Sequence, residues 1–286
     1  MKIGIIGLGL IGGCLGIDFR AMGHQVVGIA RREKTCQVAQ ARGIVDVASI
    51  QLEDLVGCDV VFICTPIATI LPTVEALAAI LPQDTIVTDV GSVKAELVAA
   101  ATKHWARFVG GHPMSGKSEA GIEAAEAGLF KGNSYVITPV AVDGLETDEE
   151  AIATLETLAQ QLGSTLYHCT PEAHDRAVAW ISHLPVMVSA SLIQAALQEP
   201  DGAVRQLSEQ LASSGFRDTS RVGGGNPELG VMMAQYNRAE VLRSLKRYQQ
   251  SLEHTISQIE TKNWERLTQI LLETKAARPD FLSEQQ

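Results

Sequence analysis

The sequence has little of several features that mark particular classes of protein. No apolar run approaches the ~18–20 residues of a membrane-spanning helix, and the first expected strand begins at Lys2, which leaves no room for a signal peptide. The formal net charge is −10, which argues against a nucleic-acid partner. The five cysteines include no Cys-x-x-Cys pair, and no cluster of side chains has metal-ligand spacing. These absences favour a soluble protein of the reducing cytoplasm.

The chain carries instead a glycine-rich turn near its N-terminus. The β-branched run Ile3–Ile6 predicts a buried strand, Gly7, Gly9 and Gly12 follow it, and apolar residues then recur at helical spacing up to Met22. In a Gly-x-Gly-x-x-Gly turn the first glycine makes the turn, the second lets backbone approach a pyrophosphate, and the third lets the helix pack on the strand. An ordinary glycine-rich turn lacks this strand and helix, so the context predicts dinucleotide binding at the helix N-terminus.

A basic stretch follows the second expected strand, Gln25–Ala30. At this point an NAD-specific fold usually carries an acidic residue that binds the ribose 2′-hydroxyl. This chain has Arg31 and Arg32, followed by Lys34 and Thr35. Guanidinium groups bind phosphate through charge-assisted, two-pronged hydrogen bonds. The alternative is a solvated basic turn, but the missing acid and the paired arginines both favour NADP.

Strands and helices alternate through the first part of the chain, and only helices are expected after Thr170. This pattern predicts an α/β fold: an N-terminal, doubly wound parallel sheet of the Rossmann-like kind over residues 1–169, and an all-helical domain over residues 170–286. The later strands are expected at residues 59–64, 85–90, 107–110, 133–139 and 164–168.

Two polar residues and one polar segment are candidates for catalysis or ligand binding, judged from the sequence alone. Ser92 follows a strand, where it can cap the next helix or reach a ligand at the carboxyl ends of the strands. His112, between glycines and a proline, is either a surface-loop histidine or a catalytic one. The segment from Ser213 to Pro227 has the composition of a binding loop, in which arginine could clamp a carboxylate or simply form a surface ion pair.

The helical half carries an apolar stripe at Leu242, Leu245, Leu252, Ile256 and Ile259. We expect this stripe to be core first of all. A domain too small to bury it alone would also suit a symmetric dimer.

Six segments in order resemble the prephenate/arogenate dehydrogenase family of tyrosine biosynthesis. They span nearly the whole chain and comprise residues 7–12, 89–94, 110–116, 129–132, 182–185 and 215–221. The resemblance implies oxidation of a cyclohexadienol to a phenol, with hydride passing to a nicotinamide and the ring carboxylate leaving as carbon dioxide.

The resemblance also implies roles for individual residues. His112 would take the proton of the substrate hydroxyl, and Ser92 would orient either that hydroxyl or the histidine. Arg221 would hold the ring carboxylate. The protein is expected to be a cytoplasmic homodimer. Further substrate contacts are expected from Arg217, Asp218, His183 and Ser115, but a structural role is an equal alternative for His183, which is expected on a buried helix. The residues expected to bind NADP are Gly7, Leu8, Gly9, Leu10, Ile11, Gly12, Arg31, Arg32, Thr35, Cys64, Thr65, Pro66, Asp89 and Gly91.

Two departures from the family pattern bear on the substrate. Relatives that use prephenate often have His-Leu-Pro-His, whereas this chain has Val186 in the last place, which removes a donor for a keto acid and favours arogenate. Gly230 stands where many relatives have tryptophan, which puts a side-chain contact there in doubt.

The sequence leaves three other functions to consider. Prephenate dehydrogenase activity is the first alternative. A β-hydroxyacid dehydrogenase would carry a lysine followed one turn later by asparagine, but Lys246 is followed by Gln250. An NADP-binding regulatory module would bind cofactor without turnover.

Overall fold

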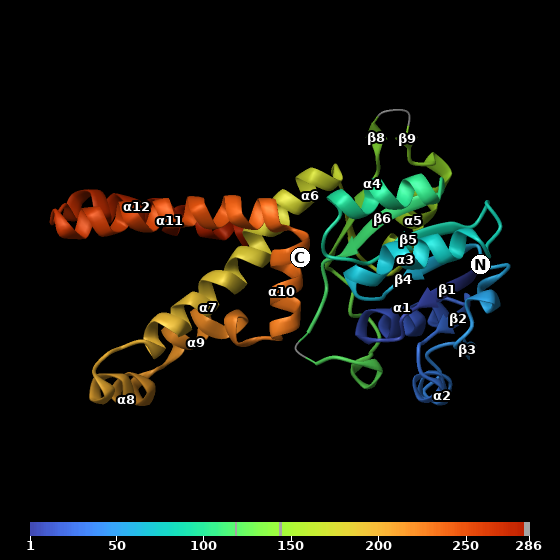
Figure 1. Ribbon diagram of the computed structural model, residues 1–286, viewed down its shortest axis with the longest axis horizontal. Helices are drawn as coiled ribbons and strands as arrows, with labels where there is room; N and C mark the ends of the chain where they lie inside the picture. The colour runs from blue at the N-terminus through green and yellow to red at the C-terminus, as the bar shows by residue number, and fades with distance from the viewer. Residues whose placement is uncertain (118, 143–144, 283–286) are drawn as a thin grey trace. The chain divides into compact units, whose positions relative to one another are not determined.

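The computed structural model describes residues 1–117, 119–142 and 145–282. Its contacts divide the chain into two compact units, Met1–Asp175 and Arg176–Gln286. The sequence predicts a boundary after residue 169. Figure 1 shows a layered α/β unit and a unit built only of helices.

In the described part of the first unit, eight strands form one sheet in the order β10-β7-β6-β5-β4-β1-β2-β3. All neighbours are parallel except β6 and β7, which pair antiparallel. The strands are β1 (Lys2–Ile6), β2 (Gln25–Ile29), β3 (Val47–Ser49), β4 (Val60–Ile63), β5 (Ile86–Asp89), β6 (Phe108–Pro113), β7 (Ser134–Thr138) and β10 (Thr165–His168). The chain winds outward in both directions from β1 and β4, which confirms the predicted doubly wound fold.

Helices cover both faces of this sheet (Figure 1). One core cluster lies under α1 (Leu10–Ala21), α2 (Glu33–Ala41) and α5 (Glu149–Gln161). The other lies under α3 (Ile67–Ala78) and α4 (Ala95–His104). Shorter pieces are η1 (Leu52–Leu55), η2 (Ile122–Ala124) and the hairpin of β8 (Ala141–Val142) and β9 (Leu145–Glu146). Burial of the apolar strands on both faces leaves the ends of the strands as the place for ligands.

Two local predictions in this unit are wrong. Strand β3 was not expected, because its three residues are too few to show alternation. His112 lies within β6 rather than in the loop after it, since Gly111 and His112 pair with Ile137 and Val136 of β7. The antiparallel partner extends β6 beyond the short strand that its own sequence suggests.

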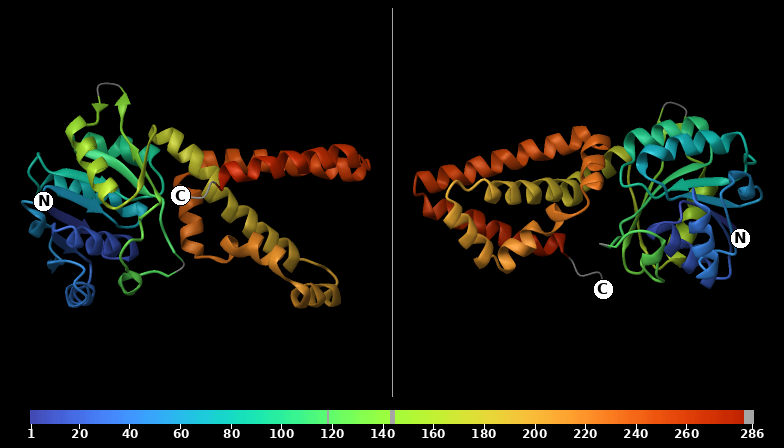
Figure 2. Two further views of the ribbon diagram at one scale, coloured as in Figure 1. Left: turned by 180° about the vertical axis from the view of Figure 1, so that it is seen from behind. Right: turned by 60° about the horizontal axis from the view of Figure 1, so that its bottom comes forward.

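The helical unit begins within α6 (Pro171–Val178) and includes the π-helical turn η3 (Ala179–His183). Its elements are α7 (Leu184–Leu197), α8 (Gly202–Leu211), α9 (Ser214–Ser220), η4 (Arg221–Gly224), α10 (Pro227–Tyr236), α11 (Arg238–Glu260) and α12 (Trp264–Phe281). Helices α11 and α12 are joined by a short turn and diverge from it (Figure 2, right).

The segment from Ser213 to Pro227 is therefore helical, and the expected irregular loop is wrong. Its second half packs on α7 through Gly223, whose N–H donates to Ser189 Oγ at 2.8 Å. That hydroxyl in turn donates to the carbonyl of Thr219 at 2.9 Å. A Cβ on Gly223 would lie 2.3 Å from the backbone N of Ala190, so only glycine permits this approach. Of the glycines that suggested a loop, Gly223 serves close packing instead.

The apolar stripe on α11 is not core within one chain, contrary to the first expectation. Leu242, Leu252, Ile256 and Ile259 are each 42% to 50% exposed. A stripe of this kind needs cover from another surface, which is the condition that a dimer would meet.

Among the residues that the structure describes, one helical stretch, Pro171–Leu197, contains an 18-residue window with a mean hydropathy of 1.4, which is long and apolar enough by those two measures to cross a membrane. The sequence by itself predicts no such run. Glu172, His174 and Asp175 lie at its start. A single helix of this kind is weak evidence for a span, because core helices of soluble proteins pass the same test.

Candidate functional site

A cavity of about 930 Å³ opens at the carboxyl ends of β1, β2 and β4. This is where the strand order reverses, the usual ligand position in an open α/β sheet. The predicted cofactor residues that line it are Gly7, Leu8, Gly9, Arg31, Arg32, Thr35, Cys64, Thr65 and Pro66. Leu10, Ile11, Gly12, Asp89 and Gly91 do not line it. The position and lining of the cavity fit a dinucleotide.

The three glycines differ in what surrounds them. Gly7 has φ +97°, a conformation that favours glycine, and Cys64 O would lie 2.6 Å from a Cβ there. A Cβ on Gly12 would lie 2.0 Å from the carbonyl oxygen of Gly7. Gly9 faces open space, with no described atom within 4 Å of the position that a Cβ would take. Because Gly9 immediately precedes α1, this space lies at the N–H end of the helix, where a pyrophosphate is stabilised.

The polar groups of the cavity also suit a phosphorylated cofactor. Arg31 and Arg32 follow β2, both are exposed, and neither forms an ion pair with any residue that the structure describes. Lys34 lies beside them in the lining. Thr65 Oγ1 is buried and has no hydrogen-bond partner among the described residues. These donors and this hydroxyl can be satisfied by ribose and phosphate oxygens.

His112, near the carboxyl end of β6, is half-buried and belongs to a chain of polar groups whose other members are buried. Its Nδ1 lies 2.8 Å from Nε2 of His174, whose own Nδ1 lies 2.8 Å from Oδ1 of Asp175. Asp175 accepts from the backbone N–H groups of Lys94 at 2.7 Å and Ala95 at 2.8 Å. Sequence reasoning missed His174 and Asp175, because 62 residues separate the two histidines.

Asp175 thus caps α4, which is one of the two roles that the sequence suggests for Ser92. That expectation is wrong, because the carboxylate of Asp175 meets the first N–H groups of α4, whose N-cap residue is Lys94. Ser92 lies three residues before the helix begins, in the loop that follows β5. It remains a candidate for substrate contact.

Asp89 is fully buried beneath the same loop. Its carboxylate forms an ion pair with Lys94 and accepts from the backbone N–H groups of Gly91 at 2.7 Å and Gly111 at 3.3 Å. Burial lowers the pKa of Lys94, an effect that the negative charge of Asp89 opposes. Asp89 therefore joins β5 to β6 next to His112, and a contact between its side chain and the cofactor stays a prediction.

Ser115 follows His112 and its strand at the same edge of the sheet. Its Oγ is buried and has no hydrogen-bond partner in the part of the chain that the structure describes. A buried hydroxyl without a partner costs free energy, so it is suited to a ligand that supplies one.

The remaining candidates lie in the helical unit. Arg217 is 74% exposed and pairs with Asp218 at 3.0 Å. Arg221 is exposed at the start of η4, which the contacts of Gly223 hold on α7. His183 is fully buried, and its Nδ1 lies 3.2 Å from Nδ2 of Asn237. This contact favours a structural role for His183 over the substrate contact expected from the sequence.

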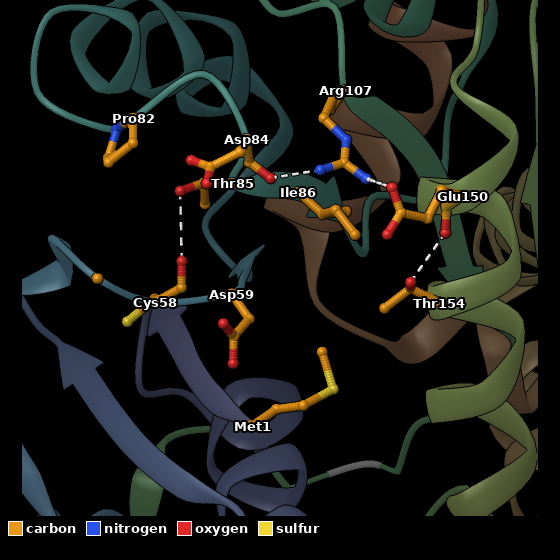
Figure 3. A pocket seen from close by; sticks show the side chains of 11 residues that line it. Met1, Cys58, Asp59, Pro82, Asp84, Thr85, Ile86, Arg107, Glu150 and Thr154 are labelled. Carbon is orange, nitrogen blue, oxygen red and sulfur yellow. Dashed lines mark hydrogen bonds and ion pairs between the residues drawn. The ribbon is translucent and has the colours of Figure 1, made fainter.

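A second cavity, of about 470 Å³, lies at the amino ends of β1, β4 and β5 (Figure 3). The guanidinium of Arg107 donates there to the carbonyl of Asp84 at 2.6 Å and pairs with Glu150 at 2.9 Å (Figure 3). None of the residues predicted for the functional site lines this cavity. The predicted site residues therefore lie away from this cavity.

Both halves of the chain match known protein families. Residues 15–168 match the nucleotide-binding domain of prephenate dehydrogenase, and residues 170–273 match the prephenate dehydrogenase dimerization domain. A prephenate dehydrogenase of Bacillus subtilis is 28% identical over 270 residues, which cover 92% of this chain and 71% of that protein. A cyclohexadienyl dehydrogenase of Zymomonas mobilis is 27% identical over 282 residues, covering 96% and 94%.

The solved structures that resemble this chain include dehydrogenases of the same family. The arogenate dehydrogenase of Synechocystis has a TM-score of 0.90 and 49% identity, covering 98% of this chain and 100% of that one. A prephenate dehydrogenase from A. aeolicus, in complex with hydroxyphenyl propionate and NAD+, has a TM-score of 0.91 and 26% identity, covering 98% of each chain. A nicotinamide cofactor is thus supported by the nucleotide-binding domain and by this complex.

Proposed function

Because this chain belongs to the prephenate dehydrogenase family, we propose that it is an arogenate dehydrogenase that uses NADP to convert L-arogenate into L-tyrosine. The observation that carries the proposal is its 49% identity, over 98% of its length, to the arogenate dehydrogenase of Synechocystis. Val186, in a place where relatives that use prephenate often have histidine, supports the amino-acid substrate over the keto acid. A cytoplasmic location and a homodimer are part of the same proposal, and the match to the dimerization domain supports the homodimer.

The reaction needs few protein groups. A nicotinamide held by the residues that line the cavity would supply the acceptor for the hydride of the ring carbon that bears the hydroxyl. The bond between the ring and its carboxylate breaks, carbon dioxide leaves, and the electron pair of that bond makes the ring aromatic with its oxygen as a phenolate. The hydroxyl proton passes to His112 and returns to the phenolate, so no net proton is consumed. Formation of the aromatic ring drives the reaction.

Each remaining candidate has one role in this proposal. Ser92 orients the substrate hydroxyl beside His112, and the buried hydroxyl of Ser115 hydrogen-bonds the substrate. Arg221 binds the ring carboxylate, since guanidinium and carboxylate match in a two-pronged hydrogen bond. Arg217 and Asp218 shape the surroundings of that arginine.

The test compares arogenate with prephenate, each with NADP and with NAD, by the absorbance of the reduced cofactor. The proposal expects the highest kcat/KM for arogenate with NADP. Equal or higher kcat/KM with prephenate would make the chain a prephenate or cyclohexadienyl dehydrogenase instead. Cofactor binding without turnover of either substrate would favour a regulatory module.

The cofactor preference is tested at the basic pair. Replacing both Arg31 and Arg32 with alanine should weaken NADP binding far more than NAD binding, because only NADP carries the 2′-phosphate. Lys103→Ala, an exposed cation on α4 away from the cavity, is the control and should change neither affinity. A double variant that still prefers NADP to the same degree contradicts the assignment.

The proton acceptor is tested by His112→Asn. A positioned general base contributes about 10²–10⁴-fold, so kcat should fall by about that factor while folding is retained. His104→Asn, at an exposed histidine 3.4 Å from Glu75, is the matched control. Arg221→Ala should mainly raise KM. Full kcat in His112→Asn would end the proposed role of this histidine.

A further inference from the structure

Asp175, His174 and His112 form a chain of hydrogen bonds. Which atom donates and which accepts in each bond follows from the chemistry of these three side chains. Asp175 accepts two backbone N–H groups of the α4 N-terminus, and a carboxylate in that position has no proton to donate. The hydrogen in the 2.8 Å contact with His174 must then be on Nδ1 of His174. A neutral imidazole with hydrogen on Nδ1 has its lone pair on Nε2.

The same reasoning extends to the second contact. Nε2 of His174 accepts at 2.8 Å from Nδ1 of His112, so Nδ1 of His112 carries the hydrogen. The lone pair of His112 is then on Nε2. A histidine that takes a hydroxyl proton needs this lone pair, and the nitrogen that donates elsewhere determines which tautomer is present.

We propose that His174 and Asp175 are positioning residues that fix His112 in the tautomer with its hydrogen on Nδ1 and its accepting lone pair on Nε2. The two residues act through His112 and do not touch the substrate. The inference rests on the proposed function for its effect on turnover, but the tautomer itself is a property of the protein without substrate.

The surroundings of the pair suit this role. His174 and Asp175 are buried, so water does not compete for their hydrogen bonds. The carboxylate is held by the helix that follows Ser92, where the positive end of the helix dipole stabilises a negative charge. The N-terminus of α4 therefore holds Asp175, which orients His174, and His174 in turn orients His112.

Two variants of His174 separate tautomer control from simple packing. His174→Phe keeps a ring but removes both nitrogens. His174→Gln retains an amide oxygen that can accept from His112 and an amide N–H₂ that can donate to Asp175. His168→Gln, at an exposed histidine paired with Glu156 at 2.9 Å, is the matched control.

The direct readout is nitrogen NMR of ring-labelled histidine in the full chain with NADP bound. The signal of His112, one of seven histidines, is identified by its loss in His112→Asn. We expect hydrogen on Nδ1 in the native protein and in His174→Gln, and on Nε2 in His174→Phe. Hydrogen on Nε2 of His112 in the native protein overturns the proposal whether or not the protein turns over arogenate.

The kinetic readout uses arogenate and NADP. His174→Phe should lower kcat by about 100-fold, near the lower limit for a general base, with KM and the NADP dissociation constant unchanged. His174→Gln should stay within about tenfold of the native kcat. An unchanged kcat in His174→Phe overturns the proposal. If His174→Phe does not fold, the native tautomer and the kcat of His174→Gln decide, and a 100-fold loss in the latter counts against it.

Discussion

Lys94 and Asp89 form an ion pair in which both side chains are 0% exposed. Asp89 also accepts N–H groups from Gly91 and Gly111, while the backbone N–H of Lys94 donates to Asp175. The pair thus lies between the loop after β5 and the polar chain of His112. A buried pair of this kind gives little net stability, but removal of one partner leaves an uncompensated charge.

We therefore expect Lys94→Met to lower the free energy of unfolding by about 3–5 kcal/mol. Adding Asp89→Asn to this variant should restore part of the loss, because the remaining buried group is then neutral. Lys103→Met, on an exposed part of the same helix, should cost less than about 0.5 kcal/mol. Urea denaturation followed by circular dichroism measures all three, and equal losses at Lys94 and Lys103 would contradict the argument.

Two alanine substitutions in the glycine-rich turn should have different effects, one on stability and the other on cofactor binding. Gly12→Ala would place a Cβ 2.0 Å from the carbonyl oxygen of Gly7, so it should destabilise the fold by about 1–3 kcal/mol or more. Gly9→Ala meets open space and should cost less than about 1 kcal/mol, yet its methyl would occupy the space expected for the pyrophosphate. Thermal unfolding and cofactor titration of both variants are the measurements. Normal NADP affinity in Gly9→Ala would place the pyrophosphate elsewhere.

Cys58 lies in the lining of the second cavity (Figure 3), and its reactivity with alkylating reagents should depend on pH. Burial raises the pKa of its thiol from 9.0 to about 11. Since the thiolate is the reactive form, its alkylation near pH 8 should be about 100-fold slower than that of an ordinary cysteine. The rate should rise with pH until about 11. Mass spectrometry of iodoacetamide-treated protein gives the rate, with denatured protein as the control, and fast native labelling would contradict burial.

The parts of the fold that are local in sequence could be predicted from it. The glycine turn and Arg31 lie within one strand, one helix and the end of the next strand, so their spacing alone predicts where they lie. The contact of His112 with His174 joins residues 62 positions apart. No periodicity encodes that contact, which depends on how β6 and α6 are placed by the whole unit.

Other predictions were wrong where the same residue composition is compatible with two different structures. Glycine and serine around Gly223 suggested a loop, but the glycine is needed where η4 approaches the backbone of Ala190. The α11 stripe was expected to be core because apolar periodicity shows which face is buried without showing what covers it. In one chain, Ile256 remains 46% exposed.

The α11 stripe predicts the oligomeric state. Replacing Leu252 and Ile256 together with glutamate should convert the proposed dimer into a monomer of 30.6 kDa, since two charges would have to be buried in an apolar contact. Gln250→Glu, on the other face of the helix, is the control and should remain dimeric. Light scattering after size-exclusion chromatography measures the mass. A double variant that still has twice the mass of one chain would place the interface elsewhere.

The packing of η4 predicts a change in substrate binding without a change in chemistry. A Cβ on Gly223 would lie 2.3 Å from the backbone N of Ala190, so Gly223→Ala should displace η4 and with it Arg221. Gly224→Ala is the adjacent control, because no described atom lies within 4 Å of its Cβ position.

We expect Gly223→Ala to raise KM for arogenate by about tenfold, equivalent to ~1.4 kcal/mol, with a smaller change in kcat. The NADP dissociation constant should stay unchanged, since the cofactor cavity is lined by residues of the first unit. Steady-state kinetics with cofactor titration measure all three constants. The same KM in both alanine variants would mean that the position of Arg221 does not depend on this contact, because the clash exists only at Gly223.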